Sequence, residues 1–259
     1  MKAIILSAGQ GRRLLPRTAD RPKCLLEVGG RSLLEWQLRV LADAGVRRAT
    51  VVVGFGAEEV ERHLRDHCPR GLEVRALFNP RFVQADNLIS CLAARAEMAE
   101  DFLLINGDTL FEPVVVTRLR ASQVGSVVMA LGRKPAYDAD DMKVVCRDGL
   151  VTRIGKDLPA DLVGGEAIGV SLFRADGPLL FREVLEDVAR EPGADRRWYL
   201  SAVDRLAARG LVHSVAVDDV GWAEIDYPHD LAVASALVAG WRGARAADPA
   251  VATALTVTV

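Results

Sequence analysis

Apolar and polar positions in the first 110 residues alternate between short apolar runs and longer amphipathic stretches. The short runs are rich in Val, Ile and Leu, as expected for strands buried on both faces, and lie at residues 2–6, 49–53, 72–78 and 102–105. Apolar residues recur at helical spacing in residues 33–44, around Val60 and Leu64, and in residues 87–98. Ser32 suits the N-cap of the first helix, and Gly45 its end. This alternation predicts parallel strands with helices on both faces of a sheet.

The pattern changes after residue 110, where strands and helices no longer alternate regularly. Strands are predicted at residues 124–131, 142–146, 150–154, 167–173 and 212–217, and helices at 176–190, 197–209 and 228–239. Arg147-Asp148-Gly149 is a good hairpin turn between two of these strands. No repeat or linker divides the chain. We therefore expect a single α/β domain over residues 1–240, with a mixed, mainly parallel sheet flanked by helices, and a C-terminal tail over residues 241–259.

Composition narrows the class of protein. The chain has 259 residues, half of them apolar, and a net charge of −2, which gives no general attraction to nucleic acid or to an anionic membrane. Four scattered cysteines imply neither a disulfide framework nor a zinc knuckle. The first apolar run is too short for a signal peptide, and no window approaches the roughly 20 apolar residues of a membrane span. We expect a cytoplasmic protein. The tail, rich in Ala, Val and Thr, is open to three interpretations: a frayed end, an edge strand or a homodimer contact.

A glycine-rich, basic loop follows the first predicted strand. In an open parallel sheet, ligands bind beyond the carboxyl ends of the strands, and glycines let backbone N–H groups approach phosphate oxygens. Residues 12–31 carry six basic side chains against two acidic ones, which indicates an anionic ligand. Arg12-Arg13-Leu14 does not supply the Gly-Lys-Ser/Thr of a Walker A loop, and Leu14 stands where the dinucleotide fingerprint needs its third glycine.

The ordered residues Gly9-x-Gly11-x-Arg13, Pro16, Thr18 and Pro22-Lys23 closely resemble the signature of nucleotidyltransferases that activate phosphorylated small molecules. The resemblance implies a Rossmann-like nucleotidyltransferase fold, with residues 1–110 as the nucleotide-binding half and residues 111–240 as the acceptor and metal half. It implies that the loop amides and Arg13 hold a triphosphate and that Lys23 neutralises charge at the reacting phosphates, which makes Arg13 and Lys23 the expected catalytic residues. The residues expected at the nucleotide are Leu6, Ala8, Gly9, Gly11, Arg12, Arg13, Lys23, Asp86, Asn87 and Ser90.

Two aspartates are candidates for a metal site. Asp108 directly follows the fourth apolar run, so it points to the same edge of the sheet as the glycine loop. The stretch WAEIDYPHDL resembles the family segment that carries a second metal-binding aspartate, here Asp226. The resemblance implies that Asp108 and Asp226 bind Mg²⁺, which prefers carboxylate and phosphate oxygens. Glu224 shares a strand face with Asp226, and its role stays open. His63 and His67 have zinc-ligand spacing, but their charged neighbours favour a solvated helix face.

Several later stretches resemble the phosphocholine cytidylyltransferase-like branch of this family, which also includes enzymes that act on small phosphonates. They are Asn79-Pro80-x-Phe82, Asp86-Asn87-x-x-Ser90, Asp141-Met142-Lys143-Val144, Gly155-Lys156-Asp157-Leu158, Gly165-Glu166-x-Ile168-Gly169 and Arg197-Trp198-Tyr199. The residues expected at the acceptor are Lys143, Lys156, Glu166, Trp198 and Tyr199. Asp86 replaces an asparagine and Gly155 a serine of the branch pattern. Only 5% of the residues are aromatic, which is sparse for a cage around a trimethylammonium group.

The leading interpretation is a Mg²⁺-dependent cytidylyltransferase. CTP and phosphocholine or a small phosphonate would give a CDP- or CMP-linked product and pyrophosphate, by in-line attack on the α-phosphorus. The first alternative is a sugar-1-phosphate or inositol-1-phosphate nucleotidyltransferase that uses another nucleoside triphosphate. The second, from a different class, is a non-catalytic nucleotide-sensing subunit. The complete set of Arg13, Lys23, Asp108 and Asp226 argues against it, because a sensor has no need of all four.

Overall fold

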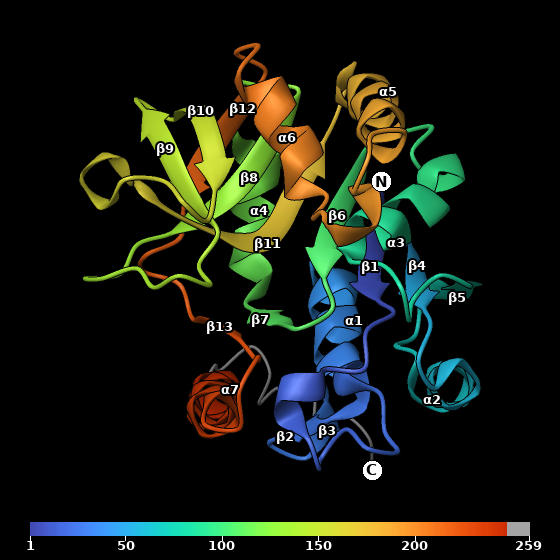
Figure 1. Ribbon diagram of the computed structural model, residues 1–259. Coiled ribbons are helices and arrows are strands. Elements are labelled where there is room, and N and C mark those ends of the chain that lie inside the picture. The colour runs from blue at the N-terminus through green and yellow to red at the C-terminus, as the bar shows by residue number, and fades with distance from the viewer. Residues whose placement is uncertain (248–259) are drawn as a thin grey trace.

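A nine-stranded mixed sheet runs through the middle of the molecule (Figure 1). The computed structural model describes residues 1–247, with side chains as far as Trp241. The strand order is β5-β4-β1-β6-β11-β8-β12-β10-β9. The strands are β1 (Lys2–Ser7), β4 (Arg48–Val53), β5 (Glu73–Phe78), β6 (Phe102–Asn106), β8 (Val127–Gly132), β9 (Lys143–Arg147), β10 (Leu150–Gly155), β11 (Gly165–Phe173) and β12 (Val212–Ala216). Strands β5, β4, β1 and β6 are parallel, whereas β11 runs against both of its neighbours β6 and β8.

Helices cover both faces of this sheet. They are α1 (Leu33–Asp43), α2 (Ala57–His67), α3 (Asn87–Ala93), α4 (Pro113–Ala121), α5 (Gly177–Ala189) and α6 (Leu200–Ala207). A further helix, α7 (Asp230–Ala247), lies outside the large sheet and packs with the N-terminal end of α1. Two further strand pairs lie outside the large sheet: β2 (Glu27–Val28) with β3 (Arg31–Ser32), and β7 (Thr109–Phe111) with β13 (Trp222–Glu224). Figure 1 shows β9, β10 and β12 on one side of the molecule and β4 and β5 on the other.

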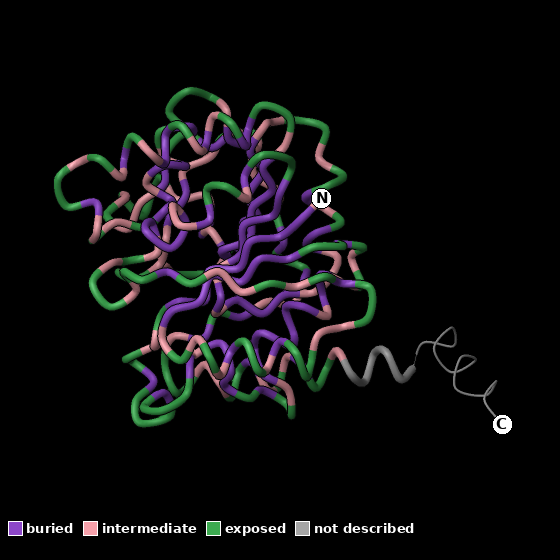
Figure 2. Tube along the Cα trace, turned by 90° about the vertical axis from the view of Figure 1, so that its right-hand side faces the viewer, coloured by how far each residue is buried: buried purple, intermediate pink, exposed green. Residues whose placement is uncertain are grey.

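Alternate residues of the central strands feed two separate cores. Ile4 and Leu6 of β1 pack with residues of α3, α5 and α6, whereas Ala3 and Ile5 pack with residues of α1, α2 and α4. This is the period-two pattern of a strand buried on both faces, and it explains why β1 is apolar almost throughout. A third core joins α7 to the N-terminal end of α1 and to the β7–β13 pair. Figure 2 shows the buried residues concentrated in the central strands.

Local sequence signals account for the element boundaries. The Ser32 hydroxyl accepts a hydrogen bond from the Glu35 amide at 3.0 Å, so Ser32 is the N-cap of α1 as predicted. Asp148 and Gly149 both have positive φ, which is the backbone of the two-residue turn that joins β9 to β10. These observations confirm the predicted α/β architecture with a mixed sheet flanked by helices.

The C-terminal end differs from the sequence-based boundaries. Helix α7 runs to Ala247 rather than stopping near residue 239, because Val238 and Trp241 still pack against the third core. Of the tail predicted over residues 241–259, residues 248–259 lie outside the described part of the chain, and so do the interpretations attached to them. Within residues 1–247, none of the helices has the length and apolar character needed to cross a membrane.

Candidate active site

A cavity of about 400 Å³ opens at the carboxyl ends of β1 and β6. The loop after β1, the N-terminal end of α3, the β9–β10 side of the sheet and the segment after β13 enclose it. Thirteen of the residues predicted for the site line the cavity: Leu6, Ala8, Gly9, Gly11, Arg13, Lys23, Asp86, Asn87, Ser90, Asp108, Lys156, Trp198 and Asp226. The fold thus brings residues from distant parts of the sequence to one end of the sheet, where α/β proteins bind their ligands.

The glycine loop adopts a backbone conformation that requires glycine at position 11. Gly11 has φ 75°, and a Cβ at this position would lie 2.9 Å from the Cβ of Lys23. The hydroxyl of Thr18, which is fully buried, donates to the carbonyl oxygen of Gly11 at 2.8 Å. These contacts fold the loop back onto Lys23, and they give a physical reason for the spacing of glycine, threonine and lysine in the motif.

Lys23 is the cation at the centre of the site. Its side chain is 12% exposed, and its Nζ lies 2.9 Å from Oδ2 of Asp108 and 2.7 Å from Oδ1 of Asp226. Burial alone would lower the pKa of Lys23, but the attraction of these two carboxylates outweighs it and raises the pKa above its ordinary value. Lys23 is therefore a permanently charged group held at the floor of the cavity.

Backbone pairing explains how two aspartates so far apart in sequence meet. Strand β7 begins immediately after Asp108 and pairs antiparallel with β13, which ends two residues before Asp226. The amide of Ile225 donates to the carbonyl oxygen of Asp108 at 3.1 Å. The carboxylate of Asp230 then accepts from the amides of Asp226 and Tyr227 at 2.8 and 2.7 Å. Asp230 thereby fixes the turn that carries Asp226.

The turn that carries Asp108 is held by a buried glutamine, Gln37. Gln37 of α1 is 1% exposed, and its Nε2 donates to the carbonyl oxygens of Asn106 and Thr109 at 2.7 and 2.8 Å. A Cβ on Gly107 would lie 2.4 Å from Oγ of Ser7, so the turn between Asn106 and Asp108 passes too close to β1 for any side chain. Gln37 and Gly107 together fix the direction of Asp108.

The carboxylates fit a Mg²⁺ ion. Oδ1 of Asp108 is buried and has no hydrogen-bond partner, and the Lys23 ammonium between Asp108 and Asp226 shows that the group accommodates a cation. Glu224 also lines the cavity, and desolvation together with the charges of Asp108 and Asp226 raises its pKa. Among residues 1–247, no group of three or more His, Cys, Asp or Glu side chains is arranged to hold a metal ion by itself. Such an ion would therefore need further oxygen ligands, which a triphosphate can supply.

The opposite wall of the cavity carries exposed side chains. The Nζ of Lys156 lies 4.4 Å from the centroid of the Trp198 ring and 3.4 Å from Oδ1 of Asp140. Arg13 reaches this wall from the glycine loop, with its guanidinium 5.2 Å from the centroid of the Tyr227 ring. Asp86 lies at the start of α3, and partial desolvation by its surroundings raises the pKa of its carboxyl. This wall thus combines cationic, anionic and aromatic groups.

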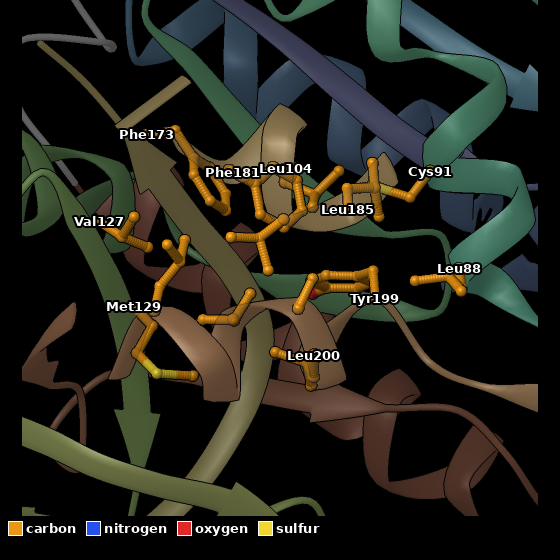
Figure 3. Close-up of a cluster of buried hydrophobic side chains, with 14 of the residues drawn as sticks. Leu88, Cys91, Leu104, Val127, Met129, Phe173, Phe181, Leu185, Tyr199 and Leu200 are labelled. Atoms are coloured by element: carbon orange, nitrogen blue, oxygen red, sulfur yellow. The ribbon is translucent and has the colours of Figure 1, made fainter. Parts of the chain in front are cut away.

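Four residues predicted for the site do not line the cavity. Arg12 is exposed on the outside of the loop. Lys143 is 6% exposed, and its Nζ donates to the carbonyl oxygens of Asp138 and Lys156. Glu166 is also buried and pairs with Lys134 at 2.9 Å. Tyr199 is fully buried among the apolar side chains of the first core, as Figure 3 shows. The buried three lie behind the cavity wall, where each supports the fold.

Sequence reasoning missed two side chains that shape the site, Gln37 and Asp140. Gln37 had a signal, since it is a polar residue on the apolar side of a helix flanked by Trp36 and Leu38. Asp140 had none, because it is one of three aspartates in the loop 138–141 and only the folded chain shows which of them faces the cavity.

Comparison with known proteins places the chain in a family. Residues 3–136 match the model of the MobA-like NTP transferase domain. This segment is more than half of the chain and contains the glycine loop, Lys23 and Asp108. The chain belongs to the MobA-like NTP transferase family. The resemblance inferred from the loop motif is thereby confirmed, and the protein is a nucleotidyltransferase by family.

Similarity extends beyond this segment in individual proteins. The bifunctional IPC transferase and DIPP synthase of Rubrobacter xylanophilus is 33% identical over 244 residues, which cover 92% of this chain and 52% of that protein. The CMP-5'-(3-aminopropyl)phosphonate synthase of Streptomyces rubellomurinus is 32% identical over 239 residues, which cover 89% of this chain and 37% of that protein. The chain thus spans about half or less of the length of these relatives.

The fold is also that of solved nucleotidyltransferase structures. The inositol-1-phosphate CTP transferase of T. maritima superposes with a TM-score of 0.77 at 23% identity, over 92% of this chain and 94% of that one. This likeness confirms the α/β nucleotidyltransferase fold over nearly the whole chain, including the second half that the family model does not cover.

Proposed function

We propose that the protein is a Mg²⁺-dependent cytidylyltransferase that couples CTP to phosphocholine or to a small phosphonate and releases pyrophosphate. The observation that carries this proposal is the position of the Lys23 ammonium between Asp108 and Asp226, beside the amides of the glycine loop. Nucleotidyl transfer needs charge neutralisation and in-line positioning more than covalent participation by the protein. The site has a central cation, two carboxylates for a metal and a loop that can hold phosphates.

In this mechanism a phosphate or phosphonate oxygen of the acceptor attacks the α-phosphorus of CTP. The bond from the α-phosphorus to the oxygen that bridges to the β-phosphate breaks, and pyrophosphate leaves with that electron pair. The glycine-loop amides and Arg13 hold the triphosphate, and Lys23 neutralises charge that develops around the α-phosphorus. Asp108 and Asp226 would hold Mg²⁺, which supplies further charge neutralisation when bound. No step requires a covalent enzyme intermediate.

The acceptor wall supports a small molecule that carries both a phosphorus oxyanion and a cationic or hydroxyl head. Lys156 is available to the oxyanion, and Asp86, Asp140 and Trp198 surround the remaining space. The relative from Streptomyces rubellomurinus is named for an aminoalkyl phosphonate product, which agrees with this chemistry.

Inositol-1-phosphate is the second candidate acceptor. The T. maritima protein of the solved structure is an inositol-1-phosphate CTP transferase, and the Rubrobacter xylanophilus relative is named as an IPC transferase. Both candidates share the loop and metal residues and differ at the acceptor wall, so the acceptor has to be found by assay.

The test is Mg²⁺-dependent release of pyrophosphate from each of four nucleoside triphosphates. The acceptors are phosphocholine, 2-aminoethylphosphonate, 2-hydroxyethylphosphonate, inositol-1-phosphate and several sugar-1-phosphates, and Asp108→Asn is the control. Release with CTP and a choline or phosphonate acceptor, lost in Asp108→Asn, is the expected result. Release only with a sugar phosphate and another nucleotide would overturn the proposal. Tight nucleotide binding without release from any pair would favour a nucleotide-sensing role.

A further inference from the structure

Asp140 lies where the two halves of the cavity meet. It belongs to the loop between β8 and β9, and its side chain is 43% exposed. One carboxylate contacts three partners from different parts of the chain. Arg13 approaches both of its oxygens at 3.4 Å, Lys156 approaches Oδ1 at 3.4 Å, and the hydroxyl of Tyr227 donates to Oδ2 at 2.8 Å. Asp140 is therefore the shared anion of two cations.

In the proposed function, both of these cations face phosphate groups of the substrates, as Lys23 also does. Arg13 comes from the glycine loop and serves the triphosphate, and Lys156 comes from the end of β10 and serves the acceptor. Both are paired with Asp140, and Arg13 also lies 3.6 Å from a carboxylate oxygen of Asp226. A phosphate group that binds either cation must compete with this carboxylate, because the same donors cannot serve both anions fully.

The fold holds Asp140 in this position. The Tyr227 hydroxyl bonds the carboxylate, and the Arg13 guanidinium lies over the Tyr227 ring. The amide of Asp140 donates to Oδ1 of Asp138, and the neighbouring Asp141 pairs with Lys134 at 2.7 Å. The hydrogen bond from Tyr227 and the charges of Arg13 and Lys156 also keep the pKa of Asp140 below its ordinary value, so the carboxylate is charged.

We propose that Asp140 is a resident counter-anion that competes with the substrates' phosphate groups for Arg13 and Lys156, so that entry of the triphosphate at Arg13 loosens Asp140 and frees Lys156 for the acceptor. This inference rests on the proposed function for its assignment of the two cations. It makes Asp140 a positioning residue that links the two substrate subsites and lowers the affinity of each when the other is empty.

The first test measures the affinity of inorganic pyrophosphate by titration calorimetry with the whole 259-residue chain. Because the pairs of Asp140 are partly exposed, their loss is worth little, and Asp140→Asn is expected to bind pyrophosphate about three- to fivefold more tightly. Asp161→Asn is the matched control, since Asp161 is exposed and lies outside the cavity. It makes the same change in net charge and should alter the affinity by less than about 1.5-fold. Thermal unfolding of each variant shows whether it is folded.

A second variant separates charge from position. Tyr227→Phe keeps the carboxylate and the aromatic ring but removes the hydrogen bond that holds Asp140, so it should give a smaller tightening than Asp140→Asn. An unchanged or weaker affinity in Asp140→Asn, or a change equal to that of Asp161→Asn, would overturn the proposal. Absence of pyrophosphate binding in every variant would overturn both this inference and the role of the glycine loop.

A kinetic measurement tests the link between subsites. In the wild-type protein the KM of the acceptor should fall as CTP approaches saturation, and in Asp140→Asn this dependence should shrink by about threefold. The binding arm does not need turnover, so tighter pyrophosphate binding by Asp140→Asn without transfer from any substrate pair would contradict the proposed function alone. Transfer together with an unchanged pyrophosphate affinity would contradict the role of Asp140 alone.

Discussion

The two ends of the cavity are built in different ways. At the nucleotide end, the glycine loop, Lys23 and Asp108 are held by backbone geometry and by buried partners such as Thr18 and Gln37. At the acceptor end, Lys156, Trp198, Asp140 and Tyr227 are long or exposed side chains that contact mainly one another. The nucleotide end is thus fixed by the fold, whereas the acceptor end can change by substitution without disturbing the core. In the proposed function, the common chemistry belongs to the first end and the choice of acceptor to the second.

The largest expected effect comes from the residue at the centre of the nucleotide end. Lys23→Met removes the ammonium between Asp108 and Asp226 and leaves their charges without this partner. We expect kcat for pyrophosphate release to fall by at least about a hundredfold, as when a group that neutralises charge in the transition state is removed. Lys23→Arg keeps the charge in another shape and should retain part of the activity. A kcat within tenfold of wild type in Lys23→Met would show that the fixed end does not carry the chemistry.

This division also decides how much of the site could be predicted from the sequence. Gly9, Gly11 and Asp108 follow apolar strands closely in the sequence, and such strand ends meet at one edge of the sheet. Arg13, Lys23 and Asp226 were predicted from the resemblance to the family, and they line the same cavity. Lys143, Glu166 and Tyr199 come from stretches that also resemble the family, yet they lie behind the cavity wall. Resemblance to the family predicts that such residues lie near the site, but the strand register decides whether each side chain faces the cavity or the core.

The strands themselves were predicted well because their apolar runs are almost continuous, as in β1 and β6. The contacts of the acceptor end could not be predicted in the same way. Tyr227 meets Asp140 only because β13 pairs with β7, and nothing in the local sequence of either strand specifies that pairing.

Glu166, which is buried behind the acceptor wall and paired with the half-buried Lys134, tests whether that end has fixed support of its own. Desolvation raises the pKa of Glu166 to about 7, an effect that Lys134 only partly offsets. The pKa of Glu166 in the folded state lies above its unfolded value of 4.5, so the folded chain holds this proton more tightly than the unfolded chain. The resulting contribution to the free energy of unfolding is fully present below pH 4.5 and is lost as pH rises through about 7. Glu166→Gln lacks this loss, so its free energy of unfolding relative to wild type should rise between pH 5 and 8, by up to about 3 kcal/mol. Denaturant unfolding at each pH measures it, and parallel pH curves would contradict the prediction.

The next effect tests whether the nucleotide end depends on backbone geometry. Gly11→Ala should lower the free energy of unfolding by about 2 kcal/mol, because alanine resists positive φ and its Cβ would crowd Lys23. Gly9→Ala is the control, since a Cβ at Gly9 would meet nothing within 4 Å and should change stability by less than about 0.5 kcal/mol. Equal stability losses in the two variants would mean that the loop needs general flexibility rather than one left-handed residue.

The smallest expected effect separates two lysines that the sequence treats alike. Lys156 lines the cavity, whereas the Nζ of Lys143 is used by the carbonyl oxygens of Asp138 and Lys156. Lys156→Ala should raise the KM of the acceptor about fivefold with little change in the free energy of unfolding. Lys143→Ala should do the reverse, with a loss of about 1 kcal/mol in stability from the two unpaired carbonyls and an acceptor KM near that of wild type. An unchanged acceptor KM in Lys156→Ala would remove Lys156 from the acceptor site. A raised KM in a fully stable Lys143→Ala would mean that Lys143 leaves its carbonyl partners when the acceptor binds, and that the acceptor end rearranges around its ligand.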